Sequence, residues 1–344
     1  MGTTFKVGIT PDFDRNAKGL IDPVLSERFD GVPGLEYGRL AEVGPVATPV
    51  QLRDVDAVIN MSLKFGPESF TGQDRLAVIA RWGVGYEMID VDACTANDVA
   101  LCITPEGVRR PMAEAEMAML LALSKRLTTK DRALRGGVWR GEGVGLGVCI
   151  HNRVVGTIGL GNIGSEFVRL LQPFGPRRIL ACDPYAAGAA AQALGAEFTD
   201  LDTLLHESDF VVVNCLLNKH TYRLLGAREL GLMKSTAYLV NCARGGIVDP
   251  RALYETLVAR RIAGAALDVF DPEPPDPADP LLRLDNVIVA PHAIAWTEEI
   301  VRDNAIADCD ACLAVFRGEV PKHIVNAEVV ARPGFQAKLA RYRR

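Results

Sequence analysis

Short apolar runs recur through the first hundred positions of the chain, separated by longer polar stretches. The runs lie at residues 5–9, 56–60, 76–80 and 100–103. Strands that alternate with helical stretches in this way usually pair in parallel, with crossover helices on the faces of the sheet. We therefore predict a parallel sheet, whose ligands would lie beyond the carboxyl ends of its strands.

Residues 111–127 form the strongest helical pattern in the chain. Pro111 suits the first turn, and Lys125 and Arg126 suit the negative end of the helix dipole. Apolar residues occupy nearly every face, so the helix must be buried, and a neighbouring subunit could cover it. The glycine-rich stretch 136–147 that follows predicts a mobile surface loop.

The alternation of strands and helices resumes in the second half of the chain. Its apolar runs lie at residues 210–214, 237–241, 265–269 and 286–290. Residues 271–280 contain five prolines, which exclude a helix or a central strand and predict a rigid loop.

Composition narrows the class of protein. A chain of 344 residues with 49% hydrophobic residues can bury large cores and suggests two domains. The net charge of −5 does not point to nucleic acid or an anionic membrane. No basic leader and no run of about eighteen apolar residues occurs, so we expect a soluble, cytoplasmic protein. Cys309 and Cys312 form a CxxC without a second pair nearby, so we predict no metal site.

Residues 154–164, VVGTIGLGNIG, have the pattern of a strand that turns sharply into a helix. Gly159 permits the tight turn, Gly161 lets the backbone approach a pyrophosphate, and Gly164 lets helix and strand pack closely. The helix predicted at 165–171 would point its positive end at the anion. The stretch therefore predicts a dinucleotide site.

An acidic residue at the end of the next strand supports this interpretation. Asp183 follows the strand predicted at 177–182, about twenty residues after the last glycine, where an acid accepts hydrogen bonds from the adenosine ribose. Its charge would repel a 2′-phosphate. The sequence thus favours NAD over NADP.

Three polar residues follow later strands and could meet at one edge of the sheet. They are Arg244, Glu273 and His292. For reduction of a 2-oxo acid, Arg244 could bind the carboxylate and polarise the carbonyl group. His292 could donate the proton, and Glu273 could stabilise its imidazolium form and raise its pKa.

Several separate motifs resemble the D-isomer-specific 2-hydroxyacid dehydrogenases, over about residues 58–326. They are the substrate loop RWGVGYEMID from Arg81, the TP and MAE motifs at Thr104 and Met112, GLGNIG from Gly159, NCARGGIVD from Asn241, DVFDPEP from Asp268, and PH at His292.

The resemblance implies an α/β fold of two doubly wound parallel-sheet domains. A Rossmann NAD domain at 106–297 would be inserted in a flavodoxin-like substrate domain made of 1–105 and 298–344. It also implies a homodimer with the helix at 111–127 in its interface, and a 2-oxo or 2-hydroxy acid as substrate.

The resemblance assigns roles to individual residues as well. Arg244, Glu273 and His292 would be catalytic, and Asp268 would hold the nicotinamide carboxamide. The other expected cofactor contacts are Thr104, Met112, Gly159, Gly161, Asn162, Ile163, Asp183, Cys215, Leu216, Cys242 and Ala243. The expected substrate contacts are Lys64, Arg81, Gly83, Val84 and Trp296.

Some positions depart from the family pattern. Leu216 stands where the family usually has proline, and Asn214 replaces a common histidine. Trp296 could shape the substrate pocket or be an indole packed between domains. Lys64 and Arg81 could equally be solvated rim charges.

Other functions remain open at this stage. The same fold and triad serve phosphonate oxidation, and an NAD-sensing, corepressor-like protein is the alternative of a different class. Glu273 argues against a formate dehydrogenase, which has Gln there. We rank glyoxylate, hydroxypyruvate or a bulkier 2-oxo acid above phosphoglycerate, which would demand more cations and often a regulatory tail domain.

Overall fold

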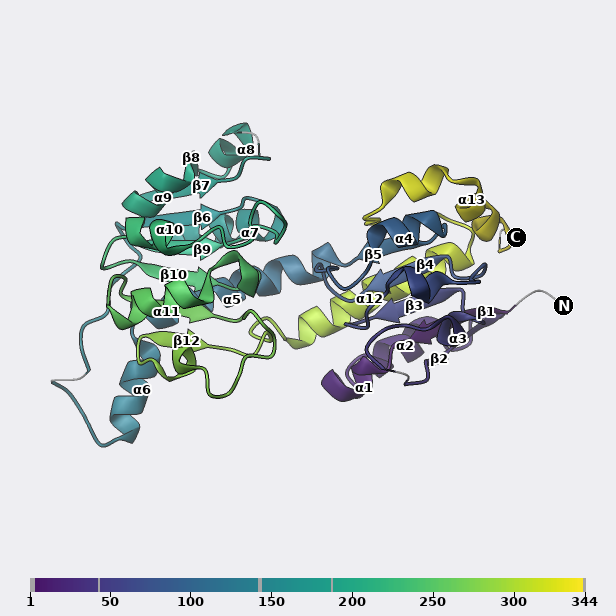
Figure 1. Ribbon diagram of the computed structural model, residues 1–344, viewed down its shortest axis with the longest axis horizontal. Helices are drawn as coiled ribbons and strands as arrows, with labels where there is room; N and C mark the ends of the chain where they lie inside the picture. The colour runs from purple at the N-terminus through teal and green to yellow at the C-terminus, as the bar shows by residue number, and fades with distance from the viewer. Residues whose placement is uncertain (1–3, 43, 142–143, 187, 343–344) are drawn as a thin grey trace. The chain divides into compact units, whose positions relative to one another are not determined.

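The computed structural model describes residues 4–42, 44–141, 144–186 and 188–342 (Figure 1). The chain divides into two compact units. The split unit is Met1–Val108 with Thr297–Arg344, and the inserted unit is Arg109–Trp296.

The split unit contains a five-stranded sheet in the order β2-β1-β3-β4-β5, with every neighbouring pair parallel. This order, 2-1-3-4-5, is the flavodoxin-like one. It confirms the fold expected for the first part of the chain. The strands are β1 (Phe5–Ile9), β2 (Leu35–Arg39), β3 (Ala57–Asn60), β4 (Val78–Arg81) and β5 (Ala100–Ile103).

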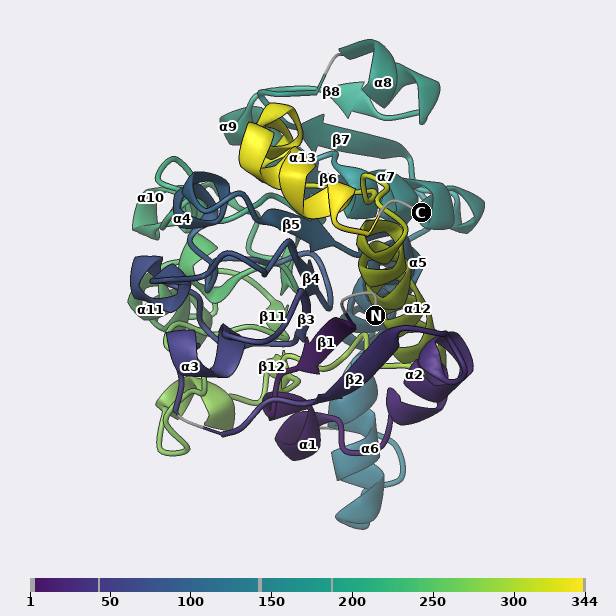
Figure 2. The same ribbon diagram turned by 90° about the vertical axis from the view of Figure 1, so that its right-hand side faces the viewer.

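Helices cover both faces of this sheet, with α2 and α12 on one side and α3 and α4 on the other (Figure 2). Apolar strand residues such as Val58 and Ile79 lie in the core beneath α3 and α4. The helical elements are α1 (Asp12–Asn16), α2 (Asp22–Phe29), α3 (Pro49–Leu52), η1 (Pro67–Phe70), α4 (Val91–Ala96), α12 (Glu298–Phe316), η5 (Ala327–Ala331) and α13 (Pro333–Ala340).

The inserted unit contains a seven-stranded parallel sheet in the order β12-β11-β10-β9-β6-β7-β8. Counted from β6, this is the Rossmann order with one further strand, and the direction of winding reverses between β6 and β9. The strands are β6 (Val154–Ile158), β7 (Arg178–Cys182), β8 (Glu197–Phe198), β9 (Phe210–Val213), β10 (Tyr238–Asn241), β11 (Gly264–Leu267) and β12 (Val287–Val289).

Two apolar layers, one on each face of this second sheet, lie between the sheet and its helices. One layer includes Leu205 of α9 and Leu257 of α11, and the other includes Leu120 of α5 and Phe167 of α7. The helical elements are α5 (Pro105–Ser124), α6 (Leu127–Arg135), α7 (Asn162–Leu171), η2 (Gln172–Phe174), α8 (Gly188–Ala193), α9 (Leu201–Glu207), α10 (Ala227–Leu232), η3 (Gly245–Ile247), α11 (Pro250–Val258) and η4 (Pro280–Arg283).

The long helix α5 differs from its prediction at both ends. It begins at Pro105, so Pro111 lies inside it. The first turns of α5 pack closely against α12, as a Cβ atom on Gly107 would lie 2.4 Å from Oδ1 of Asn304. The helix ends at Ser124, before Arg126 adopts the left-handed conformation with φ 53°.

Several other features were not predicted or were placed differently. The sequence patterns missed β2, β8 and α6, and α7 begins three residues before the predicted start at residue 165. The mobile loop predicted at 136–147 includes residues 142 and 143, which lie outside the described residues. No described helix combines the length and the apolar character needed to cross a membrane.

Candidate active site

The three glycines of the predicted dinucleotide turn follow β6, and each has a different environment. Gly159 has φ 102°, and a Cβ atom there would lie 2.6 Å from the carbonyl carbon of Asn214. A Cβ on Gly164 would lie 2.5 Å from the carbonyl oxygen of Gly159. At Gly161, apart from its own neighbours in the chain, no described atom lies within 4 Å of the corresponding position. Gly161 therefore leaves its backbone open to a phosphate, which fits a dinucleotide.

Helix α7 begins directly after this open glycine. Gly161 is its N-cap, and Asn162 and Ile163 are its first residues. The amide groups of a first helical turn have no partner within the helix, and the helix dipole adds positive charge there. The turn can thus bind an anion.

Asp183 lies beside the glycine turn and is fixed by backbone amides. Its Oδ2 accepts a hydrogen bond of 2.9 Å from Leu160 N, and its Oδ1 accepts one of 2.9 Å from Tyr185 N. Each carboxylate oxygen can accept a further hydrogen bond. Asp183 is therefore fixed beside the glycine turn and can still accept hydrogen bonds from a ligand.

Arg244, Glu273 and His292 follow the neighbouring strands β10, β11 and β12. The loops after β10 and β11 touch, since a Cβ atom on Gly245 would lie 2.0 Å from the carbonyl carbon of Phe270. The structure therefore brings these residues to one edge of the sheet.

His292 and Glu273 form a direct pair. His292 Nδ1 lies 2.8 Å from Oε2 of Glu273, and the other carboxylate oxygen accepts a hydrogen bond of 2.9 Å from Phe270 N. Burial raises the pKa of Glu273, but the hydrogen bonds from His292 and Phe270 outweigh burial and lower it. Glu273 is therefore a carboxylate at neutral pH and orients the imidazole ring.

Asp268 holds the backbone that carries His292. Its Oδ1 accepts hydrogen bonds from Ala293 N at 3.0 Å and Ile294 N at 3.2 Å. The Asp268 side chain is buried, and this burial raises its pKa. The structure thus gives Asp268 a positioning contact that the sequence did not predict.

Arg244 is partly buried at the turn after β10. Its Nη1 donates a hydrogen bond of 2.7 Å to the carbonyl oxygen of Ala243, and its charge helps to lower the pKa of Glu273. Asn241, which is buried, fixes the turn by donating to the Arg244 carbonyl oxygen and accepting from Ala243 N. Sequence reasoning treated Asn241 only as a strand residue, although its polar side chain at the end of an apolar strand was a usable signal.

The other expected cofactor residues in the inserted unit lie on three segments. Met112 packs from α5 against the apolar layer beneath the sheet. Cys215 and Leu216 follow β9, and Leu216 is exposed. The amide of Cys215 lies 2.6 Å from the position of a Cβ on Gly159. The last pair, after β10, is Cys242 and Ala243.

The expected residues of the split unit follow its strand ends. Gly83 has φ 119°, and its amide donates a hydrogen bond of 2.8 Å to Oγ1 of Thr104, so these two loops are joined. Arg81 donates to the carbonyl oxygen of Gly85. Val84 is partly buried, and Lys64 is exposed after β3.

Trp296 and the two cysteines of the CxxC motif have less defined roles. Trp296, at the end of the inserted unit, is 39% exposed. Cys309 and Cys312 lie buried in α12, and burial raises the pKa of both thiols. Among the described residues, no group of three or more His, Cys, Asp or Glu side chains is placed to hold a metal ion.

The model of the D-isomer specific 2-hydroxyacid dehydrogenase NAD binding domain matches residues 117–293. The chain belongs to this family. Its members are oxidoreductases that use NAD, and the match contains the glycine turn and the three strand-end residues.

Similar proteins match over most of their length. A glyoxylate reductase from Korarchaeum cryptofilum is 38% identical over 292 residues, covering 83% of this chain and 88% of that protein. One from Thermococcus onnurineus is 39% identical over 295 residues, with the same coverage. Among solved structures, the glyoxylate reductase from Paecilomyes thermophila is similar, with a TM-score of 0.80 and 25% identity over 94% of this chain and 99% of that chain.

Proposed function

We propose that this NAD-dependent dehydrogenase interconverts a D-2-hydroxy acid and the corresponding 2-oxo acid, with His292 and Glu273 as its acid–base pair. The hydrogen bond of 2.8 Å between His292 Nδ1 and Glu273 carries this proposal. It occupies one ring nitrogen and leaves Nε2 to exchange a proton with the substrate.

Each side chain has one task in the proposed reaction. Arg244 binds the substrate carboxylate and polarises the carbonyl group. In reduction, His292 Nε2 donates a proton to the carbonyl oxygen, and the carboxylate of Glu273 stabilises the imidazolium before and during this transfer. In oxidation, neutral Nε2 accepts the proton of the hydroxyl group. When bound, NADH supplies the hydride for the carbonyl carbon.

We propose a small 2-oxo acid, glyoxylate first, as the substrate. The similar proteins named glyoxylate reductase support this choice. Lys64, Arg81, Gly83, Val84 and Trp296 remain predicted substrate contacts. We assign the split unit to the substrate and the inserted unit to NAD.

A panel of substrates tests the proposal, with the absorbance of NADH as the readout. Glyoxylate, hydroxypyruvate, pyruvate and a bulky branched 2-oxo acid are supplied with NADH, which they would consume, and phosphite is supplied with NAD, from which it would form NADH. We expect glyoxylate to give the highest kcat/KM, and Arg244→Ala to remove most turnover while NADH still binds. Turnover of phosphite alone would favour phosphonate-type chemistry. Tight NADH binding without turnover of any acid would favour a sensor protein.

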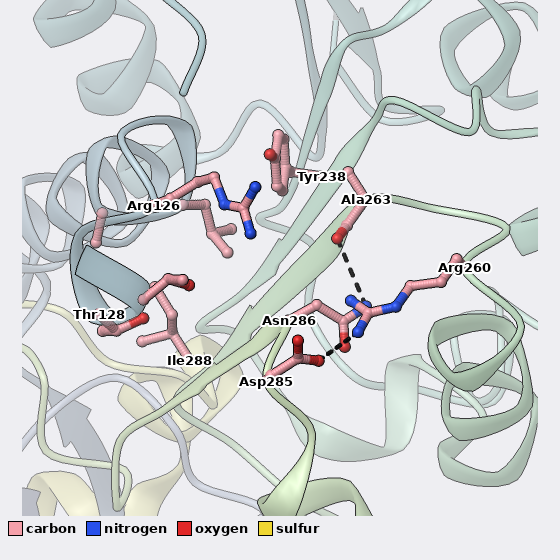
Figure 3. A pocket seen from close by; sticks show the side chains of 11 residues that line it. Arg126, Thr128, Tyr238, Arg260, Ala263, Asp285, Asn286 and Ile288 are labelled. Atoms are coloured by element: carbon pink, nitrogen blue, oxygen red, sulfur yellow. Dashed lines mark hydrogen bonds and ion pairs between the residues drawn. The ribbon is translucent and has the colours of Figure 1, made fainter. Parts of the chain in front are cut away.

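We also propose that the protein forms a homodimer through residues 122–141 and 144–147 of the inserted unit. Large apolar side chains are exposed there, including Trp139 at 71% and Leu146 at 93%, and contiguous exposed apolar surface is typical of an interface. Other residues of the same segment line a hollow of about 200 Å³, with Arg126 and Thr128 on one side and Arg260 on the other (Figure 3).

This hollow is separate from the catalytic residues. Tyr238 and Asn286, which line it, lie at the amino ends of β10 and β12, whereas Arg244 and His292 follow the carboxyl ends. Light scattering should give twice the monomer mass, and Trp139→Ser with Leu146→Ser should lower it. Val258→Ser, on exposed surface of α11, is the matched control. A monomeric wild-type protein would contradict the proposal.

A further inference from the structure

Glu116 is an acidic residue in an apolar layer. It lies on α5, on the helix face that also carries Ala113, Met117 and Leu120, and only 1% of its surface is exposed. Its Oε2 has no hydrogen-bond partner among the described residues. A carboxylate is costly in such surroundings. Burial raises the pKa of Glu116 to about 8, so the side chain is largely a neutral acid at pH 7.

The polar neighbour of Glu116 leads to the glycine turn. A hydrogen bond with the Asn214 side chain lowers the pKa of Glu116, by less than burial raises it. The Asn214 amide also donates to Oγ1 of Thr157 at 3.2 Å. Thr157 Oγ1 in turn donates to the carbonyl oxygen of Gly159 at 2.9 Å. A chain of hydrogen bonds therefore connects α5 with the first glycine of the turn.

Asn214 is also packed against the turn itself. A Cβ atom on Gly159 would lie 2.6 Å from the Asn214 carbonyl carbon, and one on Gly164 would lie 3.2 Å from the Asn214 Cβ. These close approaches are possible because residues 159 and 164 carry no side chain, so Asn214 lies directly against the turn. A change at Glu116 that shifts the Asn214 side chain therefore reaches the turn.

We propose that Glu116 is a positioning residue for the dinucleotide, which as a neutral acid contacts Asn214 beside the glycine turn and which, when it ionises, opposes the negative charge of the bound pyrophosphate and weakens binding. This inference rests on the assignment of the glycine turn as the NAD site. The pyrophosphate adds negative charge near α7, which disfavours a second buried negative charge at Glu116. By linkage, ionisation of Glu116 must then weaken NADH binding by the same factor.

The groups that face Glu116 allow its titration to be separated from others. From β6 and β9, the facing polar groups are Thr157 and Asn214, which do not titrate. From the end of β10, Cys242 responds to the charge of Glu116, although burial is the larger cause of its raised pKa. Asp268, beyond β11, also acts on Cys242. On α7, Glu166 is paired with Arg110 and Arg169.

The test is the dissociation constant of NADH between about pH 6.5 and 9.5, measured by NADH fluorescence for wild type, Glu116→Gln and Glu114→Gln. Glutamine keeps the size and the carbonyl acceptor but cannot ionise. Glu114 is on the same helix, exposed and paired with Arg110, so it is the matched control.

We expect wild type and Glu114→Gln to lose about tenfold in NADH affinity above pH 8, which corresponds to a rise of about one unit in the Glu116 pKa on binding. Glu116→Gln should bind NADH equally well across the range. The same pH dependence in Glu116→Gln, or no pH dependence in wild type, would overturn the inference.

A second variant covers the case in which Glu116→Gln does not fold. Asn214→Ala breaks the chain of hydrogen bonds and should both weaken NADH binding at pH 7 and reduce its pH dependence. Retention of the full wild-type pH dependence would overturn the inference. If Gly161→Val leaves NADH affinity unchanged, the assignment of the glycine turn fails instead, which separates the two failures.

Discussion

The orientation of His292 is set by neighbours on two sides. His292 has φ 53°, a conformation that costs a non-glycine residue free energy and persists where the surroundings enforce it. Asp268 fixes the two following amides, and Glu273 holds Nδ1. The ring is therefore positioned before substrate arrives, which lowers the entropic cost of the reaction.

We expect Asp183 to decide the choice of cofactor. Asp183→Ala removes the charge that would repel a 2′-phosphate, so we expect the ratio of NADPH to NADH dissociation constants to fall by about tenfold or more. Calorimetry with each cofactor measures both constants. An unchanged ratio would mean that another group selects NAD.

The three glycines of the turn after β6 have different surroundings. Gly159 and Gly164 are packed against backbone atoms, whereas Gly161 faces open space. The three positions have the same residue type but different physical constraints, which the spacing of the glycines predicted.

Alanine at two of these glycines should separate packing from binding. Gly164→Ala places a Cβ 2.5 Å from the Gly159 carbonyl oxygen, so we expect a loss of about 1–3 kcal/mol in unfolding free energy. Gly161→Ala should keep the stability and weaken NADH binding, because its Cβ enters the space for the phosphate. Urea unfolding and NADH titration measure the two effects. Equal stability of both variants would contradict this difference.

Elements with a local signal could be predicted from the sequence, and those fixed by distant contacts could not. Buried parallel strands are continuous apolar runs, so β3, β9 and β10 were found to within a residue or two. The edge strand β2 has alternating exposure and charged residues, and gave no such run. The start of α5 depends on packing against α12, which no local pattern contains.

The placement of Arg244, Glu273 and His292 at one edge of the sheet was predicted because parallel strands end at the same edge. The polar contacts beneath these residues were not predicted. The sequence patterns did not single out Glu116. Its position in the apolar stripe with Ala113 and Leu120 was the signal that could have revealed its burial.

At the scale of the molecule, the buried acid also affects stability. The pKa of Glu116 is about 8 in the folded protein, against about 4.3 for an unperturbed glutamate. Between these values the folded state binds the additional proton, so the unfolding free energy falls as pH rises. The contribution of Glu116 to the unfolding free energy is fully present below about pH 4.3 and is lost as the pH rises towards about 8.

Glu116→Gln should therefore remove this part of the pH dependence. We expect the stability of wild type relative to Glu116→Gln to decline by a few kcal/mol, to order of magnitude, between about pH 5 and pH 8. Urea unfolding without NADH at several pH values measures this difference. Parallel stability profiles of the two proteins would show that Glu116 is not neutral in the fold.

The most direct test of the proposed reaction is the turnover of glyoxylate by His292→Gln, measured with the NADH dissociation constant of the same variant. His220→Gln, at an exposed position, is the matched control. We predict that His292→Gln loses about 10³-fold in kcat, since general acid catalysis contributes on this order, while its NADH affinity and the activity of His220→Gln stay at the wild-type level. Wild-type turnover in His292→Gln would contradict the account.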